Sequence, residues 1–214
     1  MRIIKRTAEL IGRIAALFCP KSAPTLYRAT IAHIYTGFLK RNFYAFGQDS
    51  VIAYRATNLQ GLEQIAIGNS TQISKGIQLT AWATPEDKPH CVKIKIGNNC
   101  NIRNDAHITA INSVVIGDNL LTGTNVLITD NSHGTTDAMD LQLPPDERRI
   151  ISKGPVRIGR NVWIGNNACI MPGVSIGDGA VIGANSIVTK DIPPYCVAAG
   201  IPARIISNKQ KELI

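Results

Sequence analysis

An aliphatic residue returns at every sixth position in the second half of the chain, a period that neither a helix nor an ordinary strand has. These positions are Ile158, Ile164, Ile170, Ile176, Ile182 and Val188. Shorter runs with the same spacing lie upstream, at Ile67, Ile73 and Leu79, at Ile96, Ile102 and Ile108, and at Ile116, Thr122 and Ile128. A hexad repeat is typical of stacked β-coils, and it constrains the fold more than any other feature of the sequence.

Each hexad predicts a short extended stretch followed by a corner, so that three hexads close one triangular coil with one inward aliphatic residue per side. Glycine, asparagine and aspartate after the aliphatic residue provide the backbone angles that tight corners need. Small or branched residues that permit close stacking follow four positions later, at Val162, Ala168, Val174, Ala180 and Ser186. The sequence therefore predicts a mainly β protein, a parallel β-helix of five coils stabilised by stacking.

Three stretches longer than a hexad separate the predicted coils. Leu79 to Ile96 is 17 residues, Ile108 to Ile116 is 8, and Ile128 to Ile158 is 30. If three hexads make one coil, all three insertions leave the prism at the same corner. Insertions gathered on one edge are how a repeat protein builds a binding site, and the longest, about 130–155, is predicted to protrude as a loop.

The two ends of the chain differ from the repeat. Apolar residues recur at helical spacing in 5–18 and in 25–46, and predict two amphipathic helices that cap or flank the prism. Prolines stop the repeat after residue 192. We therefore divide the chain into a helical region (1–48), a β-helix domain (49–192) and a C-terminal extension (193–214).

The net charge of +8 is concentrated at the N-terminus. Residues 1–48 hold eight Lys or Arg against Glu9 alone, which is +7, and the rest is nearly neutral. Such a patch suits an anionic membrane surface or an acidic partner rather than nucleic acid, with solvated helix faces as the alternative. Glu9 and Arg13 interrupt the first apolar stretch too early for a signal peptide, so a cytoplasmic location is expected, with peripheral contact at the inner membrane face.

Five cysteines lack the paired spacing of a zinc site, and no metal is expected. Cys100 and Cys169 lie inside the repeat, where small apolar residues belong. Both are predicted to be buried reduced thiols.

The motifs VWIG, PGVSIGDGAVIGANSIVTKDIPP and VAAGIPARII resemble those of the hexapeptide-repeat acyltransferases. The resemblance covers about residues 50–207. It is strongest to the branch of galactoside and maltose O-acetyltransferases and of the O-acetyltransferases of capsule, lipopolysaccharide and colanic acid synthesis. It implies a left-handed β-helix, a homotrimer, and acetyl-coenzyme A as co-substrate in a groove between two prisms.

In that family the catalytic residue is a histidine at the start of the protruding loop, and His133 of LITDNSHGTTD occupies this place. Because the thioester is already activated, the reaction needs a base that works near pH 7 beside the acceptor hydroxyl, and imidazole has a suitable pKa. Direct transfer then requires no acyl-enzyme intermediate. Asp130 could orient the ring, or it could be a loop carboxylate that faces water.

The resemblance also assigns six residues to the coenzyme A groove: Trp163, Asn166, Ala184, Thr189, Lys190 and Arg204. Galactoside-type members hold the sugar with an Asn and an Asp, but Arg103 and Ile111 stand at those positions here. The acceptor contacts are thus not preserved, and the acceptor, a saccharide or a lipid-linked saccharide, need not be a galactoside. Nearby candidates for its binding are Asn104, Asp105, His107 and Asn112.

Three other functions stay open. An antibiotic O-acetyltransferase of the streptogramin-modifying type would use the same histidine and groove. A zinc hydratase on the same prism would need three converging histidines from His33, His90, His107 and His133. A scaffold that has lost its chemistry is the non-enzymatic alternative.

Overall fold

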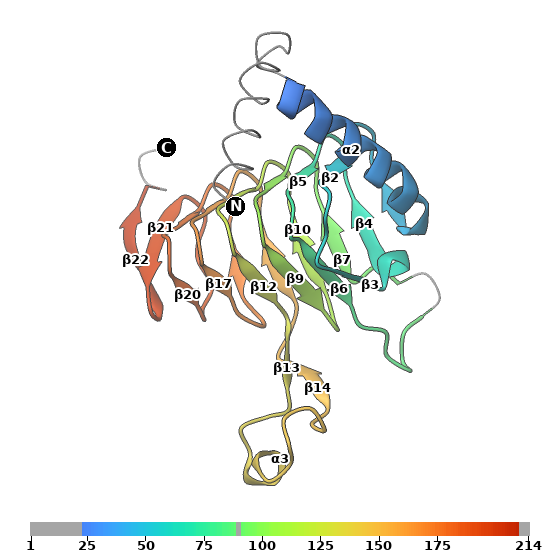
Figure 1. Ribbon diagram of the computed structural model, residues 1–214. Helices are drawn as coiled ribbons and strands as arrows, with labels where there is room; N and C mark the ends of the chain where they lie inside the picture. Colours follow the sequence, from blue (N-terminus) through green and yellow to red (C-terminus); the bar gives the residue numbers. More distant parts are fainter. Residues whose placement is uncertain (1–22, 89–90, 210–214) are drawn as a thin grey trace, which may run out of the picture.

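The computed structural model describes residues 23–88 and 91–209. Three sheets of mainly parallel strands surround one core (Figure 1). Sheet A contains β1 (Ala45–Phe46), β4 (Ile65–Ile67), β7 (Ile94–Ile96), β10 (Val114–Ile116), β15 (Val156–Ile158) and β18 (Ser175–Ile176). Sheet B contains β2 (Val51–Ile52), β5 (Gln72–Ile73), β8 (Asn101–Ile102), β11 (Leu121–Thr122), β16 (Trp163–Ile164), β19 (Val181–Ile182), β21 (Cys196–Gly200) and the antiparallel β22 (Ala203–Asn208). Sheet C contains β3 (Asn58–Gln60), β6 (Gln78–Ala81), β9 (His107–Ala110), β12 (Leu127–Thr129), β17 (Cys169–Ile170) and β20 (Ile187–Val188).

The chain visits sheets A, B and C in turn, and each triad of strands is one coil. Six such triads are present, so the predicted count of five is one too low. The additional coil is β1 to β3, in which Phe46, Ile52 and Leu59 pair with Ile67, Ile73 and Leu79 of the next coil. The hexad search missed this coil because an aromatic residue opens it and the step from Ile52 to Leu59 is seven positions instead of six.

The predicted inward positions form the core. All fifteen hexad residues named above are at most 3% exposed, and equivalent residues stack in register from coil to coil. Fully burying an aliphatic side chain of this size stabilises a fold by about 1.5–3 kcal/mol. The small residues four positions later are buried as well. Stacking between coils therefore supplies the stability, as predicted.

Asparagines complete the corners of the coils. Asn119, Asn125, Asn161, Asn167 and Asn185 have positive φ, which asparagine tolerates better than most residues. Their side chains hydrogen-bond from one coil to the next, with Nδ2 to Oδ1 distances between 2.9 and 3.1 Å. Each corner thus repeats both the backbone turn and the polar contact of the corner beneath it.

The two cysteines of the repeat lie in different environments. Cys100 is buried, and loss of hydration raises the pKa of its thiol. Cys169 is only half-buried, because it precedes the inward Ile170 and points to the outer face of sheet C. The prediction is confirmed for Cys100, whereas full burial of Cys169 is wrong.

The insertions share one corner, as predicted. Each runs from a strand of sheet C to a strand of sheet A, between β6 and β7, between β9 and β10, and between β12 and β15. The longest begins after Thr129 and ends before Val156. It contains the antiparallel hairpin of β13 (Asn131–His133) and β14 (Ile150–Ser152) and the short helix α3 (Ala138–Leu141), and it projects from the coils (Figure 1).

Helix α2 (Ala23–Leu39) lies against β2, the edge strand of sheet B, and is followed by the short helix η1 (Lys40–Asn42). The Thr36 hydroxyl accepts a hydrogen bond from the Ile52 amide (2.9 Å) and donates one to the Ile52 carbonyl (3.2 Å). It thereby occupies backbone groups that an edge strand leaves open. The helix predicted in 5–18 lies outside the described residues. Among the described helices, none is long and apolar enough to cross a membrane.

Gly61 precedes the short helix η2 (Leu62–Gln64) with a left-handed φ of 65°, and a Cβ there would overlap the carbonyl oxygen of Ala81. We expect Gly61→Ala to lower the free energy of unfolding by about 2–4 kcal/mol, because backbone strain and overpacking add. Denaturant titration measures this. The control is Gly37→Ala in α2, where nothing lies within 4 Å of the new Cβ and stability should be unchanged or slightly higher. Equal stability of the two variants would contradict the argument.

Candidate functional site

A groove of about 420 Å³ lies between the outer face of sheet C and the β13–β14 hairpin. Neutral polar side chains and apolar side chains line it. Of the described residues that line it, none is Asp, Glu, Lys or Arg. The lining residues used below are Thr80, Trp82, His107, Thr109, Asn131 and His133.

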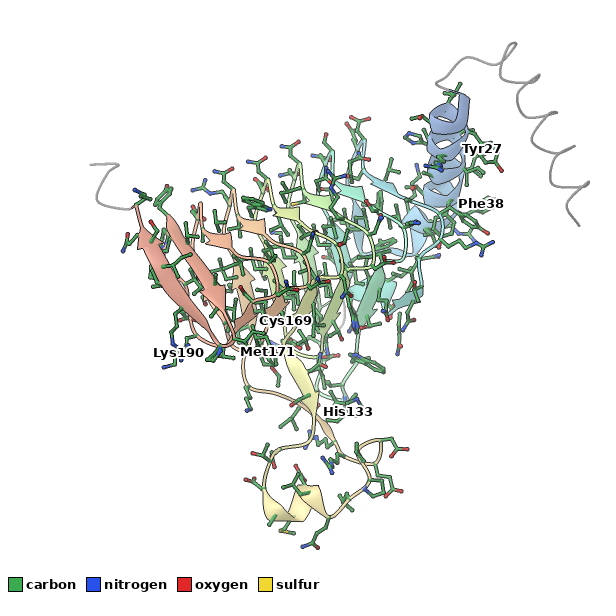
Figure 2. The ribbon with its side chains drawn as sticks, turned by 60° about the vertical axis from the view of Figure 1, so that its left-hand side comes forward. Tyr27, Phe38, His133, Cys169, Met171 and Lys190 are labelled. Carbon is green, nitrogen blue, oxygen red and sulfur yellow. The ribbon has the colours of Figure 1, made fainter. Side chains whose placement is uncertain are left out.

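The hairpin positions His133 over this groove (Figure 2). Asn131, two residues earlier on β13, donates from Nδ2 to the Thr109 hydroxyl (3.3 Å) on sheet C. Side chains two apart on a strand lie on the same face, so His133 shares the groove-facing side with Asn131. His133 pairs with Ile150 across the hairpin, and its side chain is exposed. An exposed imidazole on a two-stranded stem is accessible to a bound hydroxyl.

Asp130 has a structural position that neither sequence expectation described. Its carboxylate is fully buried and accepts hydrogen bonds from the amides of Ile111 (2.9 Å), Asn112 (2.8 Å) and Ser113 (2.6 Å). A fourth bond comes from Asn131 Nδ2 (3.0 Å). Asp130 therefore neither faces water nor orients His133. It holds the corner between β9 and β10 against the start of the protruding loop.

Trp82 and a row of threonines were missed by sequence reasoning. Trp82 donates from Nε1 to the Thr109 hydroxyl (3.1 Å), which also accepts from Asn131. Thr80, Thr109 and Thr129 are neighbours in register across three coils. Each directly follows an inward aliphatic residue, as in Leu79-Thr80, Ile108-Thr109 and Ile128-Thr129. This repeated pair of Leu or Ile followed by Thr could have indicated the threonine row from the sequence.

The Thr80 hydroxyl is buried in this groove and has no hydrogen-bond partner. A buried hydroxyl without a partner costs about 1–3 kcal/mol.

Trp82 belongs to the first insertion, which an ion pair anchors. Lys93 is buried, lies 2.7 Å from Asp87, and donates to the Trp82 carbonyl (2.5 Å). Desolvation raises the pKa of Asp87, but hydrogen bonds from Lys93, Thr84 and Gln64 outweigh it and place this pKa well below its usual range. The carboxylate therefore stays charged at neutral pH, and the insertion is held where Trp82 can reach sheet C.

The four acceptor candidates do not lie together. His107 lines the groove with His133, and burial lowers its pKa, which keeps the imidazole neutral at pH 7. Asn104 and Asp105 lie at the corner between sheets B and C, where Asp105 has a φ of 60°. Asn112 lies at the corner held by Asp130 and does not line the groove.

The coenzyme A candidates are distributed over two other edges. Trp163 is 53% exposed and lines a second groove, of about 300 Å³, with Asn166 and with Arg103 and Asn104. The Asn166 side chain accepts from the Thr124 amide (2.9 Å), and Ala184 belongs to the same corner one coil further on.

The remaining three lie near the C-terminal end of the coils. Thr189 and Lys190 follow β20 at the corner between sheets C and A (Figure 2 labels Lys190). Arg204 is exposed on β22 and donates to the carbonyl of Ala203. Within one chain, His133 and Trp163 thus line different grooves.

Comparisons with known proteins agree on one family. A profile described as bacterial transferase hexapeptide (six repeats) matches residues 155–190. The putative lipopolysaccharide biosynthesis O-acetyl transferase WbbJ of Escherichia coli (strain K12) is 39% identical over 122 residues, which are 56% of this chain and 62% of WbbJ. The galactoside O-acetyltransferase of the same strain is 43% identical over 118 residues, 53% of each protein. The chain thus spans between half and two thirds of these curated relatives.

Solved structures extend the match. A maltose O-acetyltransferase from Clostridium difficile 630 is 32% identical, with a TM-score of 0.54 over 80% of this chain and 73% of that one. AntD, an N-acyltransferase from Bacillus cereus, was solved as a mutant with dTDP and coenzyme A. It shares the fold with a TM-score of 0.65 at 20% identity, over 83% of this chain and 90% of that one.

Proposed function

Because the chain belongs to the hexapeptide-repeat acyltransferases, we propose that it transfers an acetyl group from acetyl-coenzyme A to a hydroxyl of a saccharide acceptor. His133 is the general base. The observation that carries this proposal is the exposed His133 imidazole at a groove lined by neutral polar and aromatic side chains. The names of the relatives, among them O-acetyltransferases of lipopolysaccharide, galactosides and maltose, support the same class of reaction.

The groove suits a saccharide by its chemistry. A neutral polar group that exchanges hydrogen bonds with sugar hydroxyls is provided by His107, and Trp82 adds an aromatic surface. His107 can donate as well as accept because its imidazole is neutral. A lipid-linked saccharide would place its sugar in the same groove.

The proposed reaction is a direct transfer. His133 removes the proton of the acceptor hydroxyl while the hydroxyl oxygen attacks the thioester carbonyl carbon. The tetrahedral intermediate collapses, the carbon–sulfur bond breaks, and the proton on His133 passes to the leaving thiolate. The products are the acetyl ester and coenzyme A.

A complete site requires more than one copy of the chain in this proposal. His133 and Trp163 line separate grooves on one chain, on sheets C and B respectively. A homotrimer of left-handed coils, as the family resemblance implies, brings the hairpin of one copy beside sheet B of the next. Acetyl-coenzyme A then lies between copies, in contact with Trp163, Asn166 and Ala184. Thr189, Lys190 and Arg204 contact it nearer the C-terminal end of the coils.

The acceptor is tested by a screen with labelled acetyl-coenzyme A over free sugars, lipid-linked oligosaccharides and streptogramins. We expect label in a saccharide ester. Label only in a streptogramin would show antibiotic modification through the same base, and label in no acceptor would favour a scaffold. Either outcome overturns the proposed acceptor class.

Trp163→Ala is expected to raise the KM for acetyl-coenzyme A by roughly tenfold with a much smaller change in kcat, because a large exposed aromatic contact is removed from binding. Steady-state kinetics with varied acetyl-coenzyme A measure this. Tyr44→Ala is the matched control, since Tyr44 is similarly exposed, at 50%, and lines neither groove. A KM equal to that of the unaltered protein would remove Trp163 from the proposed coenzyme A site.

A further inference from the structure

One exposed face of α2 is apolar. Tyr27, Ile34 and Phe38 are 67%, 56% and 73% exposed, and with Ile31 they follow the spacing of one helical stripe. Figure 2 shows Tyr27 and Phe38 on the side of α2 turned from the coils. The opposite side, with Ala32 and Thr36, is buried against sheet B. The helix therefore has a second apolar face where the predicted amphipathic pattern would place polar residues.

A groove of about 670 Å³ runs beside this stripe, between α2 and the corner that follows sheet B. Tyr27 and Ile31 belong both to the stripe and to the groove wall, and Arg28 and Lys75 contribute two cations to that wall. Of the described residues that line the groove, none is acidic. The ion pairs found within the described part of the chain, Lys93 with Asp87 and Arg160 with Asp178, involve neither of these cations.

The charge of the whole N-terminal region has the same sign. The stretch 23–48 contains Arg28, Lys40 and Arg41 and no acidic residue, and the preceding 22 residues add five cations against Glu9. An apolar stripe with aromatic side chains, bordered by unpaired cations, is complementary to a surface with an anionic outer layer over an apolar interior.

We propose that α2 and the adjoining groove bind the surface of an anionic membrane. Arg28 and Lys75 hold the phosphate of a lipid headgroup, for which a guanidinium and an ammonium group are suited. Ile34 and Phe38 enter the boundary between headgroups and acyl chains, and Tyr27 lies where the two regions meet.

This placement has a consequence for the acceptor. Asn104 lines both the α2 groove and the groove that contains Trp163, so the membrane-binding surface adjoins the proposed coenzyme A site. A lipid-linked saccharide would then be presented at the membrane surface. That consequence rests on the proposed function, whereas membrane binding itself does not.

The test is co-sedimentation of the full chain with vesicles of phosphatidylcholine alone or with one third phosphatidylglycerol, without acetyl-coenzyme A. We expect binding that depends on phosphatidylglycerol and weakens with salt. Ile34→Ser combined with Phe38→Ser should lower the partition coefficient by roughly tenfold or more, and Arg28→Gln combined with Lys75→Gln by roughly tenfold. The matched controls, Met139→Ser on the protruding loop and Lys95→Gln on sheet A, should bind as the unaltered protein does.

Four outcomes would overturn the proposal. The first is equal binding to both kinds of vesicle, and the second is a double variant that binds like its control. The third is a smaller assembly for the Ile34/Phe38 variant in light scattering, which would show that a second copy covers the face. The fourth is release by glycerol phosphate together with unaltered binding of that variant, which would indicate a site for free phosphate. Because no transfer is measured, failure here is distinguishable from failure of the proposed enzyme.

Discussion

Replacement of His133 by alanine is expected to lower kcat by roughly a hundredfold or more, because one positioned general base typically contributes 10²–10⁴-fold. The residual rate comes from binding and alignment of the two substrates. The KM for acetyl-coenzyme A should change little, since His133 and Trp163 line different grooves of the chain. The measurement is the steady-state rate of coenzyme A release with a saccharide acceptor.

Two other histidines serve as comparisons. His33→Ala removes an exposed histidine of α2 that is far from the hairpin in sequence and does not line its groove, and it should leave turnover unchanged. His107→Gln keeps a neutral polar side chain in the same groove and should alter mainly the KM of the acceptor. Unchanged turnover in His133→Ala would remove that residue from the mechanism. A large loss of kcat in His107→Gln alone would assign the base to His107.

Asp130→Ala is expected to lower the free energy of unfolding by roughly 2–4 kcal/mol. The substitution leaves the amides of Ile111, Asn112 and Ser113 without their acceptor, and each unsatisfied buried donor costs about 1–3 kcal/mol. Water can reach part of this corner, because Asn112 is exposed, so the total is smaller than the sum. Denaturant titration measures the loss, and turnover should fall with it because β13 begins at the next residue.

The charge and the hydrogen bonds of Asp130 can be separated. Asp130→Asn retains one acceptor oxygen and should cost less than Asp130→Ala. Asp137→Ala removes an exposed carboxylate of the same loop that makes no side-chain cap, and it should change stability by less than about 0.5 kcal/mol. If Asp130→Ala were as stable as Asp137→Ala, the proposed role of Asp130 at this corner would be wrong.

The architecture could be predicted because its determinants are local. Each hexad contains its own inward residue and its own corner. The six-residue spacing of Ile158, Ile164 and Ile170 therefore identifies the buried side chains of a coil from the sequence alone. The shared corner of the insertions follows from counting alone. The first coil was not predicted because the residues from Phe46 to Leu59 do not follow a regular hexad spacing. The coil forms because its strands pair with β4, β5 and β6 of the next coil.

The site was predicted only in part. The loop that carries His133 could be located from the repeat, while the role of His133 as base comes from the family resemblance and stays a prediction. The two alternatives for Asp130, orienting the ring or facing water, were both wrong, because its carboxylate is buried against backbone amides. Asn104, Asp105 and Asn112 do not line the groove that contains His133. Trp82 and the threonine row required knowledge of which strands lie side by side.

The sequence by itself determined the triangular coil, its buried aliphatic stacks and the edge from which its loops leave, since a residue and its neighbours within six positions fix each turn. The tertiary structure decided which side chains meet. Trp82, Thr109 and Asn131 are 22 to 27 residues apart in pairs linked by hydrogen bonds, and they meet because the stacking register places their strands side by side. Contacts between coils depend on that register, and no periodicity within one coil encodes it.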